Sequence, residues 1–286
     1  MKTNTIGLWI GITLFILACG LTAPTPAQES TAGVETVVAA TLESLTAAAP
    51  NPQPSGTQAE FQNVKFTIPE NLATSAQSQI VPAADDSITG PWGVAPEHIE
   101  FVLVDYPVKD EFFPPVVRIY PAREYAEVNP WAQGSISRLQ AILASPSMPL
   151  TNDNLSTIPF NGAAAQQYAA QAKRLSFLNG NGVAMLSQYA QFPGPILKND
   201  SYYHFEGLTS DGKYLVAIMF PVTLPIQASA DNPSADGIKY PDDRSDVNGL
   251  NTYFQEMTDF LNSADPASFQ PDLNLLDTLV RSISIQ

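Results

Sequence analysis

The only two histidines of the chain each stand two residues before a glutamate, in His98-Ile99-Glu100 and His204-Phe205-Glu206. Each pair lies on or beside a run of residues that predicts a β-strand, and residues two apart in a strand point to the same face. Imidazole and carboxylate groups are ligands that zinc and iron accept. If the two strands are neighbours, the four side chains converge on a metal site. Otherwise they are polar residues on solvated strand faces.

A second candidate site lies in the irregular stretch between Pro225 and Gly249, which is rich in aspartate. Asp242, Asp243 and Asp246 are candidate ligands for an irregular calcium site. Their spacing departs from the D-x-[DN]-x-[DN]-G calcium loop, since arginine occupies the third position counted from Asp242. Loops of this length are either functional or disordered, and composition does not decide between the two.

The common catalytic and nucleotide-binding signatures are missing from the sequence. It contains no G-x-S-x-G, H-E-x-x-H or G-x-G-x-x-G motif, and no glycine-rich loop followed by Lys-Ser/Thr. Several aromatic residues could line a groove for a glycan or a peptide, although aromatics in strands more often pack in a core. They are Trp92, Trp131, Tyr168, Tyr189, Tyr202 and Tyr203.

The chain is acidic, with 28 Asp and Glu against 13 Lys and Arg and a net charge of −15. Such a field repels phosphate backbones and anionic lipid headgroups, so nucleic acid is not an expected partner. Basic or cationic partners remain open. No cofactor is expected.

The elements that must position these residues follow from hydrophobic periodicity and turn residues. Helices are expected from Asn129-Pro130 to just before Pro146, over 250–261 and over 273–285. The segment 71–81 is either a short strand or a helical turn. Strands are expected over 61–68, 99–106, 116–120, 164–178, 183–192, 202–208 and 214–220. The last four, joined at 179–182 and 210–213, predict an antiparallel meander.

The last predicted strand is apolar on both faces, which favours a sheet that is covered on both sides. The fold class expected for residues 58–286 is therefore a single α+β domain. Its mostly antiparallel sheet, with the C-terminal four-strand meander, packs between helices.

The N-terminus has the three regions of a secretory signal peptide. Lys2 is the only charged residue of 1–18, residues 6–17 are almost wholly apolar, and Ala18 precedes Cys19. The apolar run is shorter than the roughly 20 residues that a membrane-spanning helix needs. Cleavage before Cys19 removes one basic residue and no acid, which changes the net charge from −15 to −16.

The segment Ile16-Leu17-Ala18-Cys19 resembles the lipobox of bacterial lipoproteins. This resemblance implies a diacylglyceryl thioether on Cys19, an acylated amino group and palmitate-type chains, which together anchor a protein stably. The alternatives are an ordinary secreted protein or an uncleaved signal anchor. Residues 19–57 predict an Ala/Thr/Pro-rich tether, because they hold too little large apolar surface to fold. The expected location is the outer face of the cell membrane, or an outer membrane.

Two further resemblances concern the domain. Residues 177–222 resemble a segment of uncharacterised lipoproteins from environmental bacteria, which have no assigned activity. The order of elements is similar to that of the PsbP and Mog1 fold group, a likeness that implies architecture only.

These observations favour a lipid-anchored binding or scaffold module without catalytic activity, with an envelope protein or a glycan as partner. One alternative is an envelope hydrolase that uses Asp or Glu, or a metal-dependent enzyme built on the two His-x-Glu pairs. The other is a solute-binding lipoprotein of a transporter. That alternative ranks last because the sequence predicts one meander rather than two β/α lobes.

Overall fold

The computed structural model describes residues 55–84, 93–109, 111–155, 164–234 and 236–286. The chain divides into two units after Pro52, and every described residue belongs to the second, Gln53–Gln286. The signal peptide, the anchor on Cys19, the tether up to residue 54 and the groove candidate Trp92 lie outside the described residues.

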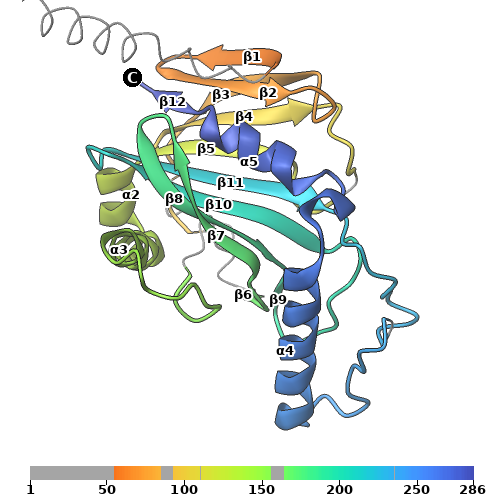
Figure 1. The fold of residues 1–286 in the computed structure, drawn as a ribbon. Helices are drawn as coiled ribbons and strands as arrows, with labels where there is room; N and C mark the ends of the chain where they lie inside the picture. The colour runs from red at the N-terminus through yellow and green to blue at the C-terminus, as the bar shows by residue number, and fades with distance from the viewer. Residues whose placement is uncertain (1–54, 85–92, 110, 156–163, 235) are drawn as a thin grey trace, which may run out of the picture. The chain divides into compact units, whose positions relative to one another are not determined.

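A seven-stranded antiparallel sheet in the order β3-β4-β5-β11-β10-β8-β7 forms the centre of the domain (Figure 1). With its helices it confirms the predicted α+β class. The prediction that β11 is covered on both faces is also confirmed, since its residues after the first are all buried. The strands are β3 (Ser75–Val81), β4 (His98–Val104), β5 (Val116–Pro121), β7 (Ala170–Phe177), β8 (Gly180–Ser187), β10 (Ser201–Thr209) and β11 (Tyr214–Val222).

Two smaller sheets correct the predicted boundaries. The strand expected over 61–68 is a hairpin of β1 (Gly56–Phe61) and β2 (Val64–Pro69), which turns where Gln62 has a positive φ of 55°. The expected strand 164–178 begins as β6 (Ala165–Gln166), which pairs with β9 (Tyr189–Ala190) apart from β7. The predicted C-terminal helix ends early, and β12 (Ser284–Ile285) joins β2.

The helices are α2 (Ala122–Val128), α3 (Pro130–Ala144), α4 (Val247–Ser263) and α5 (Leu273–Arg281), with a 3-10 turn η1 (Pro266–Ser268). Helix α3 begins as predicted, because the Asn129 side chain accepts hydrogen bonds from the backbone N–H groups of Trp131 and Ala132. Trp131 itself is 64% exposed, so it does not belong to the apolar stripe of the helix. None of the helices in the described ranges is both long and apolar enough for a membrane crossing.

Helices cover both faces of the sheet (Figure 1). Phe205 and Ile218 of the sheet share one hydrophobic core with Leu276 of α5. Met185 and Ala217 point to the opposite face and share a second core with Leu139 of α3. The strands therefore present two different faces, each with its own set of residues.

Helix α4 is fixed to β7 through an irregularity in the strand. Gln171 has a φ of 52° and interrupts the pairing of β7 with β8. Its side chain donates hydrogen bonds to the carbonyl oxygens of Leu261 (2.8 Å) and Ala264 (3.0 Å), at the end of α4. The bulge thus supplies additional hydrogen bonds to carbonyl groups at the C-terminal end of the helix, where intrahelical donors run out.

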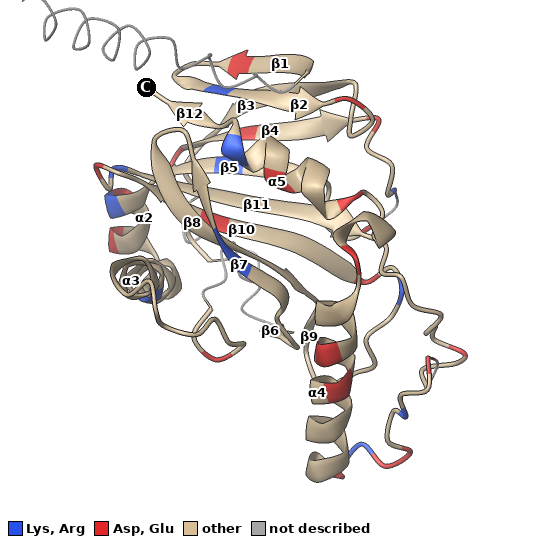
Figure 2. Cartoon of the chain, viewed as in Figure 1, with Lys and Arg blue, Asp and Glu red and all other residues tan. Residues whose placement is uncertain are grey.

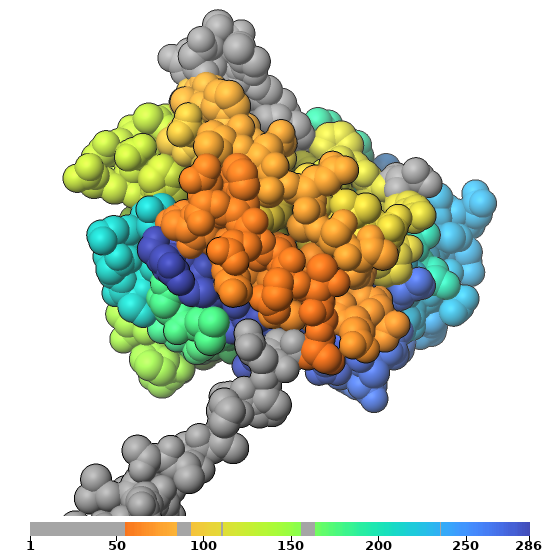
Figure 3. Space-filling view, turned by 90° about the horizontal axis from the view of Figure 1, so that it is seen from above, coloured from red at the N-terminus to blue at the C-terminus, as the bar shows by residue number. Residues whose placement is uncertain are grey.

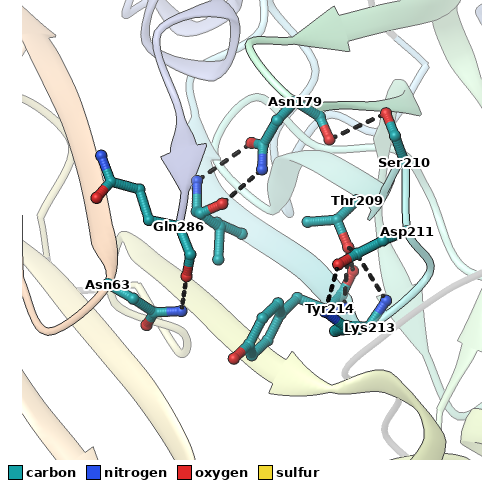
Figure 4. Close-up of polar contacts among 9 residues, drawn as sticks. Asn63, Asn179, Thr209, Ser210, Asp211, Lys213, Tyr214 and Gln286 are labelled. Carbon is teal, nitrogen blue, oxygen red and sulfur yellow. Dashed lines mark hydrogen bonds and ion pairs between the residues drawn. The ribbon is translucent and has the colours of Figure 1, made fainter.

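The C-terminal segment is held against the hairpin β1–β2, and the two lie side by side in the space-filling view (Figure 3). Figure 4 shows the contacts: the Asn63 side chain donates to the Gln286 carbonyl (2.9 Å), and the Ile285 N–H donates to the Asn179 side chain (3.1 Å). The Asn179 carbonyl in turn accepts from the N–H and hydroxyl of Ser210. Asn179 therefore ties the C-terminus to two turns of the central sheet.

Candidate functional site

Strand β10 presents different chemistry on its two faces. Tyr203 and Phe205 belong to the core beneath α5. Tyr202 packs with Val116 and Met219 on the opposite face. Because side chains alternate along a strand, His204 and Glu206 share the face of Tyr202.

His204 and Glu206 form a buried polar chain that reaches Tyr189. Both residues are 1% exposed, and His204 Nε2 lies 3.1 Å from Glu206 Oε1. The other ring nitrogen, Nδ1, lies 2.6 Å from the Tyr189 hydroxyl. A neutral imidazole that donates Nε2–H to the glutamate must accept at Nδ1, so in that tautomer the tyrosine hydroxyl is the donor. The chain therefore fixes the position of the Tyr189 side chain.

Tyr189 lines a groove of about 490 Å³. The groove is formed by the loop before β5, by β9 with the residues next to it, and by the start of β10. Aromatic and acidic side chains dominate its lining, together with amides and two alanines. The lining residues used below are Glu111, Phe112, Phe113, Tyr189, Gln191, Asp200 and Tyr202.

The aromatic rings of the groove contact one another in sequence. Phe112 and Phe113 pack edge to face with centroids 4.8 Å apart, and Phe113 packs edge to face on Tyr202 at 5.6 Å. Tyr202 and Tyr189 follow at 6.5 Å. Phe112 is 73% exposed at the outer end of this line. The groove thus has a continuous aromatic wall, which begins at the solvent and ends above His204.

The electrostatics of the groove are negative. Burial raises the pKa of Tyr202 to about 12; the Phe113 backbone N–H lowers it, whereas the charges of Glu111 and Asp200 raise it. Loss of hydration also raises the pKa of the Asp200 carboxyl. Two carboxyl groups line the groove, and no lysine or arginine is among the described lining residues. The site can therefore offset a positive charge.

The two His-x-Glu pairs do not come together. Strands β5 and β11 separate β4 from β10, so the condition for a shared metal site, adjacent strands, is not met. Glu100, Arg118, Ala217 and Glu206 occupy one row across four strands, which spans about 14 Å at 4.8 Å per strand. Within the described part of the chain, no group of three or more His, Cys, Asp or Glu side chains is placed to hold a metal ion.

The residues of the first pair have other partners. Glu100 accepts a hydrogen bond from Arg118 Nε at 2.7 Å and another from the Gln79 amide at 2.9 Å. The His98 ring packs against Tyr120 with centroids 4.4 Å apart, and its Nδ1 lies 2.9 Å from the Pro96 carbonyl oxygen. Burial lowers the pKa of His98. These contacts hold the sheet together rather than open a ligand site.

The three aspartates proposed for calcium also make local contacts. Asp246 caps α4 by accepting from the Gly249 N–H at 2.9 Å. Asp243 accepts from the N–H and the hydroxyl of Ser245, and Asp242 pairs with Lys239 at 2.9 Å. Their carboxylates are thus part of turns and a helix cap.

The aromatic groove that the sequence suggested contains only part of the expected set. Tyr189 and Tyr202 line it, whereas Tyr203 donates to Asp277 and Tyr168 donates to Ser201, both in the core. The sequence reasoning missed the loop 111–113 and Asp200. The sequence did contain one signal for this loop. Two consecutive phenylalanines before Pro114-Pro115 cannot both lie on the core face of a strand, so at least one of them must face elsewhere.

Comparisons with protein-family models, with curated proteins and with solved structures found no match to this chain.

Proposed function

We propose that this chain is a lipid-anchored protein of the cell envelope whose domain binds a ligand in the groove beside Tyr189. The lipobox-like residues around Cys19 support the anchor. The observation that carries the binding function is the buried chain from Glu206 through His204 to Tyr189. It holds one wall of the groove in place before any ligand arrives.

The cost of this arrangement supports a role in binding. Burying an imidazole and a carboxylate removes both from water, and hydrogen bonds offset part of this cost. Here these bonds end on a side chain that lines the groove. A groove wall that is ordered in advance loses less entropy when a ligand binds.

The groove also has the composition of a binding site. Its volume lies within the range of about 300–1,000 Å³ that is usual for small-molecule sites. Aromatic rings supply contact area, and Glu111, Asp200 and Gln191 supply a few polar groups. This combination fits recognition of a small molecule, or of one side chain or sugar of a larger partner.

The anchor is tested by growing cells that express the full-length chain with an alkynyl palmitate. We expect label on the wild type and loss of label on Cys19→Ser, because the thioether requires the cysteine thiol. Unlabelled wild-type protein contradicts the anchor.

The groove is tested by ligand-observed NMR of a fragment set with the full-length chain in a neutral detergent. Gln191→Trp places a large ring in the groove, whereas Lys198→Trp adds the same ring at an exposed position outside it. We expect fragment signals with the wild type and Lys198→Trp, and their loss with Gln191→Trp. Equal signals from the two variants, or none from the wild type, contradict the groove as a binding site.

A hydrolase is the second candidate, because Tyr189, His204 and Glu206 are connected in the order nucleophile, base and orienting carboxylate. This candidate predicts turnover of an activated ester such as p-nitrophenyl acetate, and loss of that turnover in Tyr189→Phe. If the groove only binds a ligand, the wild type should hydrolyse the ester no faster than Gln191→Trp, the variant in which a ring fills the groove. The two candidates are thus separated by one assay.

A further inference from the structure

We infer that the groove beside Tyr189 takes an organic cation that carries a quaternary or substituted ammonium group and no adjacent anion. The inference rests on the proposed binding function and names its ligand class. It combines two features of the same groove, the carboxyl groups and the aromatic wall.

The charge of the groove is the first feature. Glu111 and Asp200 both lie near the Tyr202 hydroxyl, and each raises the pKa of that group, so their negative potentials add inside the groove. Lys109 lines a neighbouring hollow but not this groove. Figure 2 shows further acidic residues on β10 and on α4, consistent with the net charge of the chain. A cation entering the groove gains attraction from both carboxylates.

The aromatic wall is the second feature. The rings of Phe112, Phe113, Tyr202 and Tyr189 follow one another at centroid distances of 4.8, 5.6 and 6.5 Å. The faces of aromatic rings attract cations, and weakly hydrated alkylammonium groups are bound by such walls. A compact inorganic cation would have to give up its hydration without receiving the oxygen ligands it needs. The aromatic wall therefore favours an alkylated ammonium group over a metal ion.

The carboxylates also set a limit on the rest of the ligand. A phosphate or carboxylate next to the ammonium group would be repelled by Glu111 and Asp200. A free quaternary ammonium compound is thus expected to bind more tightly than the headgroup of a zwitterionic lipid. At about 490 Å³ the groove has room for a tail beyond a trimethylammonium group.

Calorimetric titration of the full-length chain in a neutral maltoside detergent tests this. Choline is compared with 3,3-dimethylbutan-1-ol, which has the same shape without the charge, and with phosphocholine. We expect choline to bind about tenfold more tightly than either. Its affinity should fall as ionic strength rises from about 0.01 to 0.15 M, which shortens the screening length from roughly 30 to 8 Å.

Variants assign the effect to the groove. Asp200→Asn and Glu111→Gln should each weaken choline binding by about three- to tenfold, and Tyr202→Leu by a similar factor. Glu256→Gln removes the same charge from an exposed position on α4 and should change the affinity by less than about twofold. Lys109→Met should strengthen binding, because it removes a positive charge near the groove.

The outcomes separate this inference from the proposed function. If 3,3-dimethylbutan-1-ol binds as tightly as choline and Gln191→Trp abolishes both, the groove is a binding site but not for cations. Tighter binding of phosphocholine than of choline also overturns the inference. If no compound binds and the fragment set gives no signal, the inference and the proposed function fail together.

Discussion

The substitution Glu100→Gln tests whether the first His-x-Glu pair stabilises the fold. The Glu100 carboxylate lies 2.7 Å from Arg118 Nε, and the two side chains are only 12% and 19% exposed. Burial alone raises the pKa of Glu100, but the charge and hydrogen bond of Arg118, with smaller contributions from Gln79 and His98, outweigh this, so the pKa is lowered. The charged form of Glu100 is therefore stabilised by its partner on the neighbouring strand.

The size of the effect follows from charge separation and exposure. Two unit charges about 4 Å apart attract by about 4 kcal/mol at an effective dielectric constant of 20. Breaking a fully buried pair costs roughly 3–5 kcal/mol, because the remaining charge stays buried. Water reaches part of this pair, which reduces that cost. We expect Glu100→Gln to lower the free energy of unfolding by about 2–3 kcal/mol.

The assay is urea unfolding of the full-length chain. With a slope of about 2–3 kcal/mol/M, the expected loss moves the midpoint down by about 1 M. The control is Glu60→Gln, which removes an exposed cross-strand partner of Lys65 at 3.8 Å, with side chains 68% and 49% exposed. That variant should lose no more than about 0.5 kcal/mol. The double variant Glu100→Gln with Arg118→Met should recover much of the loss, because no charge is then left buried.

A loss in Glu100→Gln no larger than that in Glu60→Gln would refute the reasoning, as would strict additivity in the double variant. The pH dependence gives an independent check. Because the folded pKa of Glu100 is lowered from 4.5, its contribution is present above that pH and is lost as pH falls through the folded pKa. The difference between the wild type and Glu100→Gln should therefore shrink in acid.

Three further predictions concern the sheet, the acidic loop and the C-terminus. Burial lowers the pKa of His98 below 6.5, so the unfolded chain binds more protons than the folded chain, and stability should fall as pH drops from about 7 to 5. Urea midpoints measured over this pH range should depend less on pH in His98→Phe than in the wild type. Asp246→Ala should cost about 1 kcal/mol through loss of the α4 cap, and added calcium or EDTA should leave the wild-type midpoint unchanged. Asn179→Ala removes hydrogen bonds to Ile285, so it should cost about 1–2 kcal/mol and speed amide exchange in β12.

Local patterns in the sequence predicted the elements that depend on neighbouring residues. The Asn129-Pro130 pair marked the start of α3, and the apolar residues of 214–220 marked a strand buried on both faces. Helix α2 was missed because it follows β5 directly and has only seven residues, too few for a helical period to stand out.

The turn between β7 and β8 does not lie where the Asn-Gly repeat predicted it. The Asn-Gly repeat predicted a turn over 179–182, but Phe177 pairs with Gly180, so the turn consists of Leu178 and Asn179. Gly180 and Gly182 lie within β8, where an added Cβ would meet the carbonyl oxygens of Leu208 and Glu206 at 2.3 and 2.2 Å. These glycines serve the close approach of two strands, which only the pairing of β8 with β10 shows.

The sequence does not reveal strand order, and for this reason the two His-x-Glu motifs could not be told apart from the sequence alone. Alternation assigns His98, Glu100, His204 and Glu206 to strand faces, but it does not say which strands are adjacent, because the pairing of β5 with β11 joins residues about 100 positions apart.

The fold gives the two motifs different roles on the same face of the sheet. Glu100 is neutralised within the sheet by Arg118 on the adjacent strand, and the contacts of Arg118 continue to the buried Tyr120 and from there to Tyr125. None of these side chains lines the groove. Glu206 is instead paired with His204, whose second nitrogen reaches a residue of the groove. A buried pair that served stability alone could be replaced by apolar side chains at little cost or with a gain. The difference in where each chain of contacts ends is therefore the physical ground for assigning structure to the first motif and for proposing ligand binding at the second.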